Sequence, residues 1–534
     1  MLYIFMALVQ LIMTIIMIIY FSSAIKDRHK SKTSLYCCDA EAKNLKRLRE
    51  IHLSKPLTEV LRPSSPSEII GQAEGMRALE NALCGKNPCH VIIYGPPGVG
   101  KTAAAKVALE MAKASQSTPF RADAPFVEAD ATLMQYDERA IADPLLGSVH
   151  DPIYQGAGSF GSMGVPRPTP GAVTKAHGGV LFLDEIGELS THHLNKLLKV
   201  LEEGKVSFHS TYYSATNSNI PKYIHDIFKN GMPADFRLIG ATTRSPNELP
   251  PALRSRCKEI FFNELDKSDV KKIAENACKR LQCNYEPSVP NLVSEYCSNG
   301  REAIGIIQSS LNEAKRCNKN AVDKTDVKAV LSQSKFTKKH QQTISSKGRV
   351  GIVNGMAVCG LCGKVITVEA SAARGNACLS VRGVAKEEEF KGNSSHLTRR
   401  GSALEAAENV LDVLETLTDF KKEDWQISIN FPSSPITDGP SAGVAMLLAV
   451  YSAVFNIPIR GDIALTGELG LKGDILPVGG IREKTSAALK SGIKKAYIPM
   501  ENADDVTDSR VISLQRAEDV IALADTEKVS KLPA

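Results

Sequence analysis

Two residues in the C-terminal part of the chain, Ser441 and Lys484, are of types that can cleave an acyl bond together. Ser441 lies in the segment 436–443, Ile-Thr-Asp-Gly-Pro-Ser-Ala-Gly, and Lys484 ends the segment 479–484, Gly-Gly-Ile-Arg-Glu-Lys. Serine is a weak nucleophile at neutral pH and needs a neighbouring base. A lysine can be that base only when its pKa is lowered toward neutrality. The pair therefore predicts a nucleophile and its general base.

Two physical effects are expected to lower the pKa of Lys484. A helix is predicted over 483–490, so the lysine lies in a first turn, where the helix dipole disfavours an ammonium. Burial against apolar neighbours favours the neutral amine as well. The apolar run 444–455 predicts another helix starting at or just after Ser441, and an N–H at that start is a candidate oxyanion donor. The competing interpretation is a capping serine and a solvated lysine.

A second chemistry is encoded far upstream, in a glycine-rich loop. A short apolar strand, 91–94, leads into this loop, and an alanine-rich helix is predicted over 103–113. Strand, loop and helix in this order predict a phosphate-binding loop whose backbone N–H groups hold ATP. Lys101 is expected to reach the β and γ phosphates, and Thr102 to bind Mg²⁺. The loop consists of Gly95, Pro96, Pro97, Gly98, Val99, Gly100, Lys101 and Thr102.

Two further apolar strands are predicted to end in polar residues beside this loop. The first runs through Gly-Gly-Val-Leu-Phe-Leu to Asp184 and Glu185, and such continuous apolar strands are typical of a parallel sheet covered on both faces. Ligands bind at the carboxyl ends of strands in open α/β sheets. Asp184 is therefore expected to hold Mg²⁺ and Glu185 to polarise the attacking water. The second strand, 236–243, ends at Thr243, which is expected to sense the γ phosphate.

The segment 251–257, Pro-Ala-Leu-Arg-Ser-Arg-Cys, resembles the arginine-finger segment of AAA+ ATPases. The resemblance implies that Arg256, or as second choice Arg254, acts on the nucleotide of a neighbouring subunit. Asn-Gly-Arg-Glu-Ala at 299–303 resembles the sensor-2 segment of the same ATPases and implies that Arg301 contacts the nucleotide. A residue that acts in trans requires a ring of identical chains. By the family resemblance that homo-oligomer is a hexamer.

Three segments of the C-terminal part, 437–443, 465–468 (Leu-Thr-Gly-Glu) and 473–484, follow one another in an order that resembles the proteolytic domain of the Lon family. The resemblance implies that Ser441 is the nucleophile, Lys484 the general base and Thr466 a hydrogen-bond partner of the lysine. With the AAA+ motor, it implies an ATP-dependent endopeptidase that unfolds and degrades protein substrates. The alternative is a membrane-tethered AAA+ remodelling ATPase or chaperone with little or no proteolysis.

The first 21 residues contain no charged side chain, and about 20 such residues span a bilayer as a helix. We therefore predict a transmembrane anchor at 1–21, with a signal peptide cleaved after 22–24 as the alternative. Basic residues follow at once, so the rest of the chain is expected in the cytoplasm. Residues 22–62 hold ten Lys or Arg against five Asp or Glu, which favours anionic lipid over nucleic acid as a partner.

Length and composition agree with a multidomain globular protein. The 534 residues, 43% hydrophobic and 23% charged, allow about three or four domains. The predicted fold class is α/β: an AAA+ parallel-sheet ATPase core with a small helical lid, plus an α+β Lon-type proteolytic domain. The expected parts are the anchor 1–21, a basic linker 22–60, the ATPase core 61–262, the lid 263–336, a linker 337–348 and the proteolytic domain 349–534.

Several weaker patterns remain. The resemblance is nearest to the shorter, membrane-anchored B-type (LonB-like) Lon proteases of spore-forming bacteria, which implies a role in sporulation. Tyr154 and Phe160, among glycines, are candidates for gripping substrate in a central pore, with packing on their own domain as the alternative. A DNA-acting motor is disfavoured because no helix-turn-helix or zinc finger is recognisable. Cys359-Gly-Leu-Cys362 has half of a zinc ligand set and predicts a hairpin turn, and Cys37-Cys38 is a candidate palmitoylation site.

Overall fold

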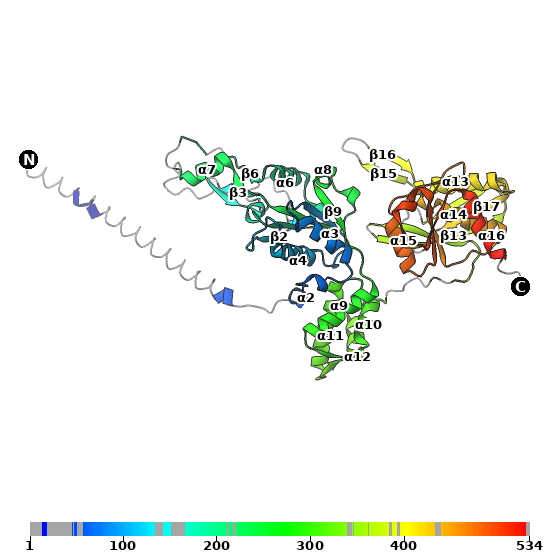
Figure 1. Ribbon diagram of the computed structural model, residues 1–534, viewed down its shortest axis with the longest axis horizontal. Coiled ribbons are helices and arrows are strands. Elements are labelled where there is room, and N and C mark those ends of the chain that lie inside the picture. Colours follow the sequence, from blue (N-terminus) through cyan, green and yellow to red (C-terminus); the bar gives the residue numbers. More distant parts are fainter. Residues whose placement is uncertain are drawn as a thin grey trace, which may run out of the picture. The chain divides into compact units, whose positions relative to one another are not determined.

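The computed structural model describes residues 13–15, 17–18, 45, 47–50, 57–133, 143–150, 166–210, 213–216, 220–338, 344, 346–360, 362–383, 387–391, 396–432 and 439–529. The chain divides into two compact units, 1–60 and 61–534, drawn in Figure 1. In the first unit the described residues are helical, including α2 (Leu57–Val60). No helix among the residues described is long and apolar enough to cross a bilayer. Most of 1–21 lies outside them, as do Cys37, Cys38, Tyr154 and Phe160.

A five-stranded parallel sheet forms the centre of the ATPase part, in the order β2-β5-β8-β1-β9. Alternate residues of β1 enter two different apolar cores: Val91 and Ile93 pack with α3 and α4, and Ile92 and Tyr94 pack with α6. Both faces are therefore covered, as the continuous apolar strands predict. The elements are β1 (His90–Tyr94), β2 (Phe126–Asp130), β5 (Val180–Asp184), β8 (Arg237–Thr242), β9 (Cys257–Phe261), α3 (Ala73–Leu83), α4 (Lys101–Ala114), α5 (Ala172–Lys175), α6 (Thr191–Glu203), α7 (Lys222–Asn230) and α8 (Pro251–Arg254).

Among the described residues, two short antiparallel strand pairs are inserted into this part. The first joins β3 (Gly147–His150) to β4 (Arg167–Pro170) just before the strand that carries Asp184. The second joins β6 (Lys205–Val206) to β7 (Met232–Pro233), with α7 between its strands. Both insertions therefore lie between elements of the parallel sheet in the chain, and the sheet itself keeps its order.

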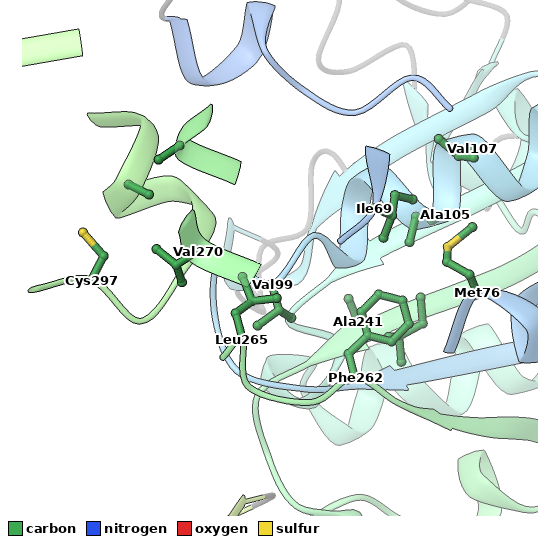
Figure 2. Close-up of a cluster of buried hydrophobic side chains, with 14 of the residues drawn as sticks. Ile69, Met76, Val99, Ala105, Val107, Ala241, Phe262, Leu265, Val270 and Cys297 are labelled. Carbon is green, nitrogen blue, oxygen red and sulfur yellow. The ribbon is translucent and has the colours of Figure 1, made fainter. Parts of the chain in front are cut away.

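Four helices form the predicted lid, and they share an apolar core with the sheet. Figure 2 shows Val99 of the phosphate loop beside Leu265, which lies just before the first lid helix, and Val270, which lies in that helix, α9. The same cluster continues through Ala303 and Ile307 of α11. The lid is thus packed directly onto the nucleotide loop. Its elements are α9 (Lys267–Arg280), β10 (Asn284–Tyr285), α10 (Val289–Tyr296), α11 (Gly300–Arg316), β11 (Ala321–Val322) and α12 (Lys324–Gln333).

The proteolytic part is built on a seven-stranded mixed sheet, in the order β14-β17-β13-β12-β18-β21-β22. Helix α14 (Gly443–Phe455) lies at the centre of the proteolytic part. Every residue from 443 to 452 is buried, against α13, α16 and the sheet. An apolar helix of this kind is expected inside a core. The other elements are β12 (Ile352–Cys359), β13 (Cys362–Arg374), β14 (Cys378–Arg382), β15 (Glu387–Lys391), β16 (His396–Arg400), α13 (Ser402–Leu417), β17 (Trp425–Asn430), β18 (Ile463–Leu465), β19 (Glu468–Leu469), β20 (Ile475–Leu476), α15 (Ile481–Lys490), β21 (Lys495–Pro499), β22 (Val511–Leu514) and α16 (Ala517–Val529).

Candidate nucleotide and peptidase sites

The phosphate loop joins β1 to α4, as predicted, and it is docked on the lid. Gly98 and Gly100 have φ of 75° and 98°, a left-handed backbone that favours glycine. A Cβ on Gly98 would lie 2.9 Å from the side chain of Asn299. The amide of Gly300 donates to the Gly98 carbonyl over 3.1 Å. The start of α11, which carries Arg301, is therefore fixed against the loop.

Lys101 lies inside this loop, with 7% of its surface exposed. Its Nζ donates to the carbonyl oxygens of Gly95, over 2.6 Å, and Pro96, over 3.3 Å. Burial lowers the pKa of Lys101, the carboxylates of Glu185 and Asp184 oppose that shift, and Arg301 adds to it. Four of the charges predicted for the site thus act on one another. An ammonium that already lies among loop carbonyls is well placed for a phosphate.

The carboxylates follow β5, and the structure gives them different surroundings. Burial, and then the charge of Glu185, raise the pKa of Asp184. A divalent cation would relieve both effects, so Asp184 together with the Thr102 hydroxyl at the start of α4 suits Mg²⁺. Glu185 has φ of 48°, a left-handed conformation that is uncommon for a residue other than glycine. Such backbone strain is often found at functional sites.

Thr243 holds Glu185 in this structure. Both its backbone N–H and its hydroxyl donate to Glu185 Oε2, each over 3.2 Å. The sequence predicts a contact of Thr243 with the γ phosphate, and it does not predict this bond to Glu185. The strand end alone could not indicate it, because the bond depends on the left-handed turn at Glu185.

The two candidate finger arginines are both tied within their own chain. Arg254 Nε donates to Glu259 Oε1 over 2.6 Å, and the buried Tyr94 hydroxyl donates to the same oxygen over 3.0 Å. Arg256 pairs with Glu202 of α6, and its side chain is 37% exposed. Arg254 is thus anchored beside the strand that enters the phosphate loop, whereas Arg256 has a surface partner. This difference favours Arg256, and its action in trans stays a prediction.

Ser441 lies in a short 3-10 turn, Pro440–Ala442, directly before α14. Its carbonyl oxygen accepts two hydrogen bonds, from the Thr466 hydroxyl over 3.2 Å and from the Gly467 amide over 3.0 Å. The Val444 amide donates in return to the Gly467 carbonyl, over 3.2 Å. The strand end after β18 therefore fixes the backbone of the serine. Thr437 and Asp438 of the same motif lie outside the described residues.

Two predictions about this turn need refinement. In the structure the Thr466 hydroxyl donates to the backbone carbonyl of Ser441. The hydrogen bond between the Thr466 hydroxyl and Lys484 stays a prediction. The amides of Gly443 and Val444 already donate to the carbonyls of Pro440 and Gly467. An oxyanion donor is therefore not found at these first positions of α14.

Lys484 occupies the first turn of α15, as predicted, and is 3% exposed. Burial alone lowers its pKa to about 8. Ile481 and Ala488 of the same helix pack with Met356 and Val365 of the sheet, and this cluster excludes water from that face of the helix. A lysine whose pKa is close to neutral pH can serve as a general base for serine.

The pKa of Lys484 predicts how peptide cleavage depends on pH. The neutral amine is the active form, so kcat/KM should rise about tenfold per pH unit below pH 8 and level off above it. The measurement is hydrolysis of a short fluorogenic peptide between pH 6 and 9.5, with ATPase rates recorded in parallel. A flat peptidase profile between pH 6.5 and 8.5 would contradict the assignment of Lys484 as base.

Comparison with known proteins agrees with this geometry. The family model described as Lon protease (S16) C-terminal proteolytic domain matches residues 321–531, and that of magnesium chelatase, subunit ChlI, matches residues 66–224. Lon protease 2 of Bacillus subtilis is 49% identical over 92% of this chain and 90% of its own length. The chain belongs to the Lon protease family. It therefore combines an AAA+ ATPase with a serine protease and degrades proteins in an ATP-dependent manner.

More distant relatives show a wider range of lengths. The archaeal Lon protease of Thermococcus kodakarensis is 31% identical over 72% of this chain, but over only 63% of its own length. The match to a solved structure of Thermotoga maritima RuvB covers 51% of this chain and 72% of the RuvB chain, with 21% identity and a TM-score of 0.34. The match to the Lon proteolytic domain and to Lon protease 2 of Bacillus subtilis disfavours the non-proteolytic alternative.

Proposed function

We propose that Ser441 and Lys484 are the catalytic dyad of this protease. The observation that carries the proposal is the buried amine of Lys484, whose pKa of about 8 lets it take the proton of a serine hydroxyl. The Ser441 oxygen attacks the substrate carbonyl and expels the leaving amine, which takes up the proton from Lys484. Water then releases the acyl group from the serine. The bonds from Thr466 and Gly467 hold the serine backbone during both steps.

The ATPase part is proposed to bind ATP with Mg²⁺ and to feed this dyad. Thr102 and Asp184 would hold the cation, which supplies charge neutralisation at the phosphates. Lys101 and Arg301 contribute positive charge to the nucleotide, and Glu185 orients water for its hydrolysis. Arg256 is proposed to complete the site of the next subunit, which requires a closed ring, proposed as a hexamer.

A membrane anchor at residues 1–21 is part of the same proposal. Its support is the uncharged sequence of this stretch and the run of basic residues after it, which favour a single-pass protein with its catalytic parts in the cytoplasm. Lon protease 2 of Bacillus subtilis matches nearly the full length of this chain, and the B-type enzyme is proposed from the resemblance of the sequence alone. A role in sporulation follows only from resemblance to that type.

One experiment tests the coupled and anchored enzyme together. Full-length protein in detergent should degrade casein only with ATP and Mg²⁺, and alkaline extraction of membranes should leave it in the pellet. A form lacking residues 1–21 should move to the soluble fraction and still degrade casein with ATP. Casein cleavage that needs no nucleotide would contradict the coupling, and extraction of the full-length protein by alkali would contradict the anchor.

A further inference from the structure

We propose that Cys359 and Cys362 form a reversible disulfide that switches off peptide cleavage. The two residues end β12 and begin β13, and they lie directly opposite each other in the antiparallel register. Facing residues of antiparallel strands have Cα atoms about 4.5 or 5.5 Å apart. Both separations fall within the range that a disulfide spans. The thiols are free in this structure, Cys359 exposed and Cys362 half-buried.

The β12–β13 hairpin that carries these thiols packs against α15, the helix of the proposed general base Lys484. A Cβ on Gly363, next to Cys362, would lie 1.9 Å from the Glu483 carbonyl oxygen and 2.9 Å from the backbone nitrogen of Lys484. Real Cβ contacts are not so short, so only glycine fits there. The strand backbone thus touches the first turn of α15 with no intervening side chain.

The partner strand touches the other end of the same turn. A Cβ on Gly480, the residue before α15, would lie 2.6 Å from Cγ2 of Val358, which precedes Cys359. Both neighbours of the cysteine pair therefore contact the turn that ends at Lys484. Interiors packed this closely transmit small displacements. Facing residues of antiparallel strands have Cβ atoms about 4.5–5.5 Å apart, whereas a disulfide holds its Cβ atoms about 3.5–4.5 Å apart. Closing the bond therefore shifts the two strand ends toward each other, which moves the turn or opens it to water.

The reaction is thiol–disulfide exchange with a low-molecular-weight disulfide as oxidant. The exposed Cys359 thiolate attacks one sulfur of the oxidant, forming a mixed disulfide and releasing one thiolate. The Cys362 thiolate then attacks the Cys359 sulfur, and the second thiolate leaves. Two protein thiols lose two protons and two electrons, and the oxidant is reduced to two thiols. Burial, and then the charge and hydrogen bond of the Glu264 carboxylate, raise the pKa of Cys362 to about 12, which agrees with Cys359 reacting first.

The effect on catalysis follows from the burial of Lys484, and it rests on the proposed role of this residue as base. Burial is the cause of its lowered pKa, so the shift depends on keeping water away from the amine. Water admitted to the turn would raise the pKa toward 10.5. Less neutral amine would then be present at pH 7 to 8, and its position relative to Ser441 would change.

The test uses full-length protein treated with glutathione disulfide and then with dithiothreitol. We expect a peptide containing residues 359–362 to lose two hydrogens by mass spectrometry. Peptidase kcat should fall on the order of tenfold to a hundredfold, as for a displaced catalytic group. Its pH profile should move to higher pH, ATP hydrolysis should stay unchanged, and reduction should restore cleavage. Cys359→Ser and Cys362→Ser should retain the reduced activity and lose the response.

Cys378→Ser is the matched control, because Cys378 is an exposed thiol on β14 of the same sheet. It should respond to the oxidant like the unaltered protein. The proposal is overturned if no 359–362 disulfide forms, if the disulfide leaves peptidase kcat unchanged, or if ATP hydrolysis falls in parallel. Retention of peptidase activity by reduced Lys484→Arg would instead refute the base assignment, and the mass measurement would still report on the thiols.

Discussion

Replacing Ser441 by alanine should lower peptide and casein cleavage by about 10³-fold or more while ATP hydrolysis persists, because the residue supplies the proposed nucleophile. The change should leave the fold intact. The bonds that position this residue go to its backbone carbonyl, from Thr466 and Gly467, and alanine keeps that carbonyl. The measurements are fluorogenic-peptide and casein hydrolysis beside phosphate release from ATP, with thermal unfolding as a check of the fold.

Ser486→Ala is the control for this experiment. Ser486 is an exposed serine on α15, the helix that carries Lys484, and it does not belong to the proposed dyad. It should cleave at the unaltered rate. Cleavage by Ser441→Ala at a rate close to that of the control would show that the nucleophile lies elsewhere.

Much of the ATPase site follows from the sequence because its parts are local. The segment from β1 through the loop to α4 is continuous, and its glycines, lysine and threonine have their roles from neighbouring residues. The end of β5 is similarly fixed by its apolar run and the two carboxylates that follow it. Parallel strands then bring Asp184 and Lys101 to one edge of the sheet, as observed.

What the sequence did not predict depends on contacts between distant segments. Asn299 packs against Gly98, a residue about 200 positions away in the chain. The Asn-Gly pattern predicts the start of a helix at this point, because Asn is a favoured N-cap, but it does not predict which segment that helix start contacts. The clamp of Gly467 on Ser441 requires the strand end after β18 to meet the start of α14. The contact of Gly363 with Glu483 has no local signal at all, because it arises from packing of a hairpin on a helix.

Replacing Glu185 by glutamine should lower ATP hydrolysis about 10²- to 10⁴-fold, the usual contribution of a positioned base, while ATP binding remains. Glutamine keeps an oxygen that can accept the two bonds from Thr243, so the left-handed turn at this position should survive. Degradation of casein should be lost, whereas short peptides that need no unfolding should still be cleaved. The measurements are phosphate release, nucleotide binding by fluorescence, and the two cleavage assays.

Glu188→Gln provides the matched control for this substitution. Glu188 lies three residues further on and pairs with Arg244 over 2.7 Å at the surface. Replacing this carboxylate by an amide should therefore lower ATP hydrolysis little, because surface ion pairs contribute little. Loss of short-peptide cleavage in Glu185→Gln would mean that the ATPase state controls the dyad itself, and not only the delivery of substrate. ATP hydrolysis by Glu185→Gln near the unaltered rate would exclude Glu185 as the residue that orients water.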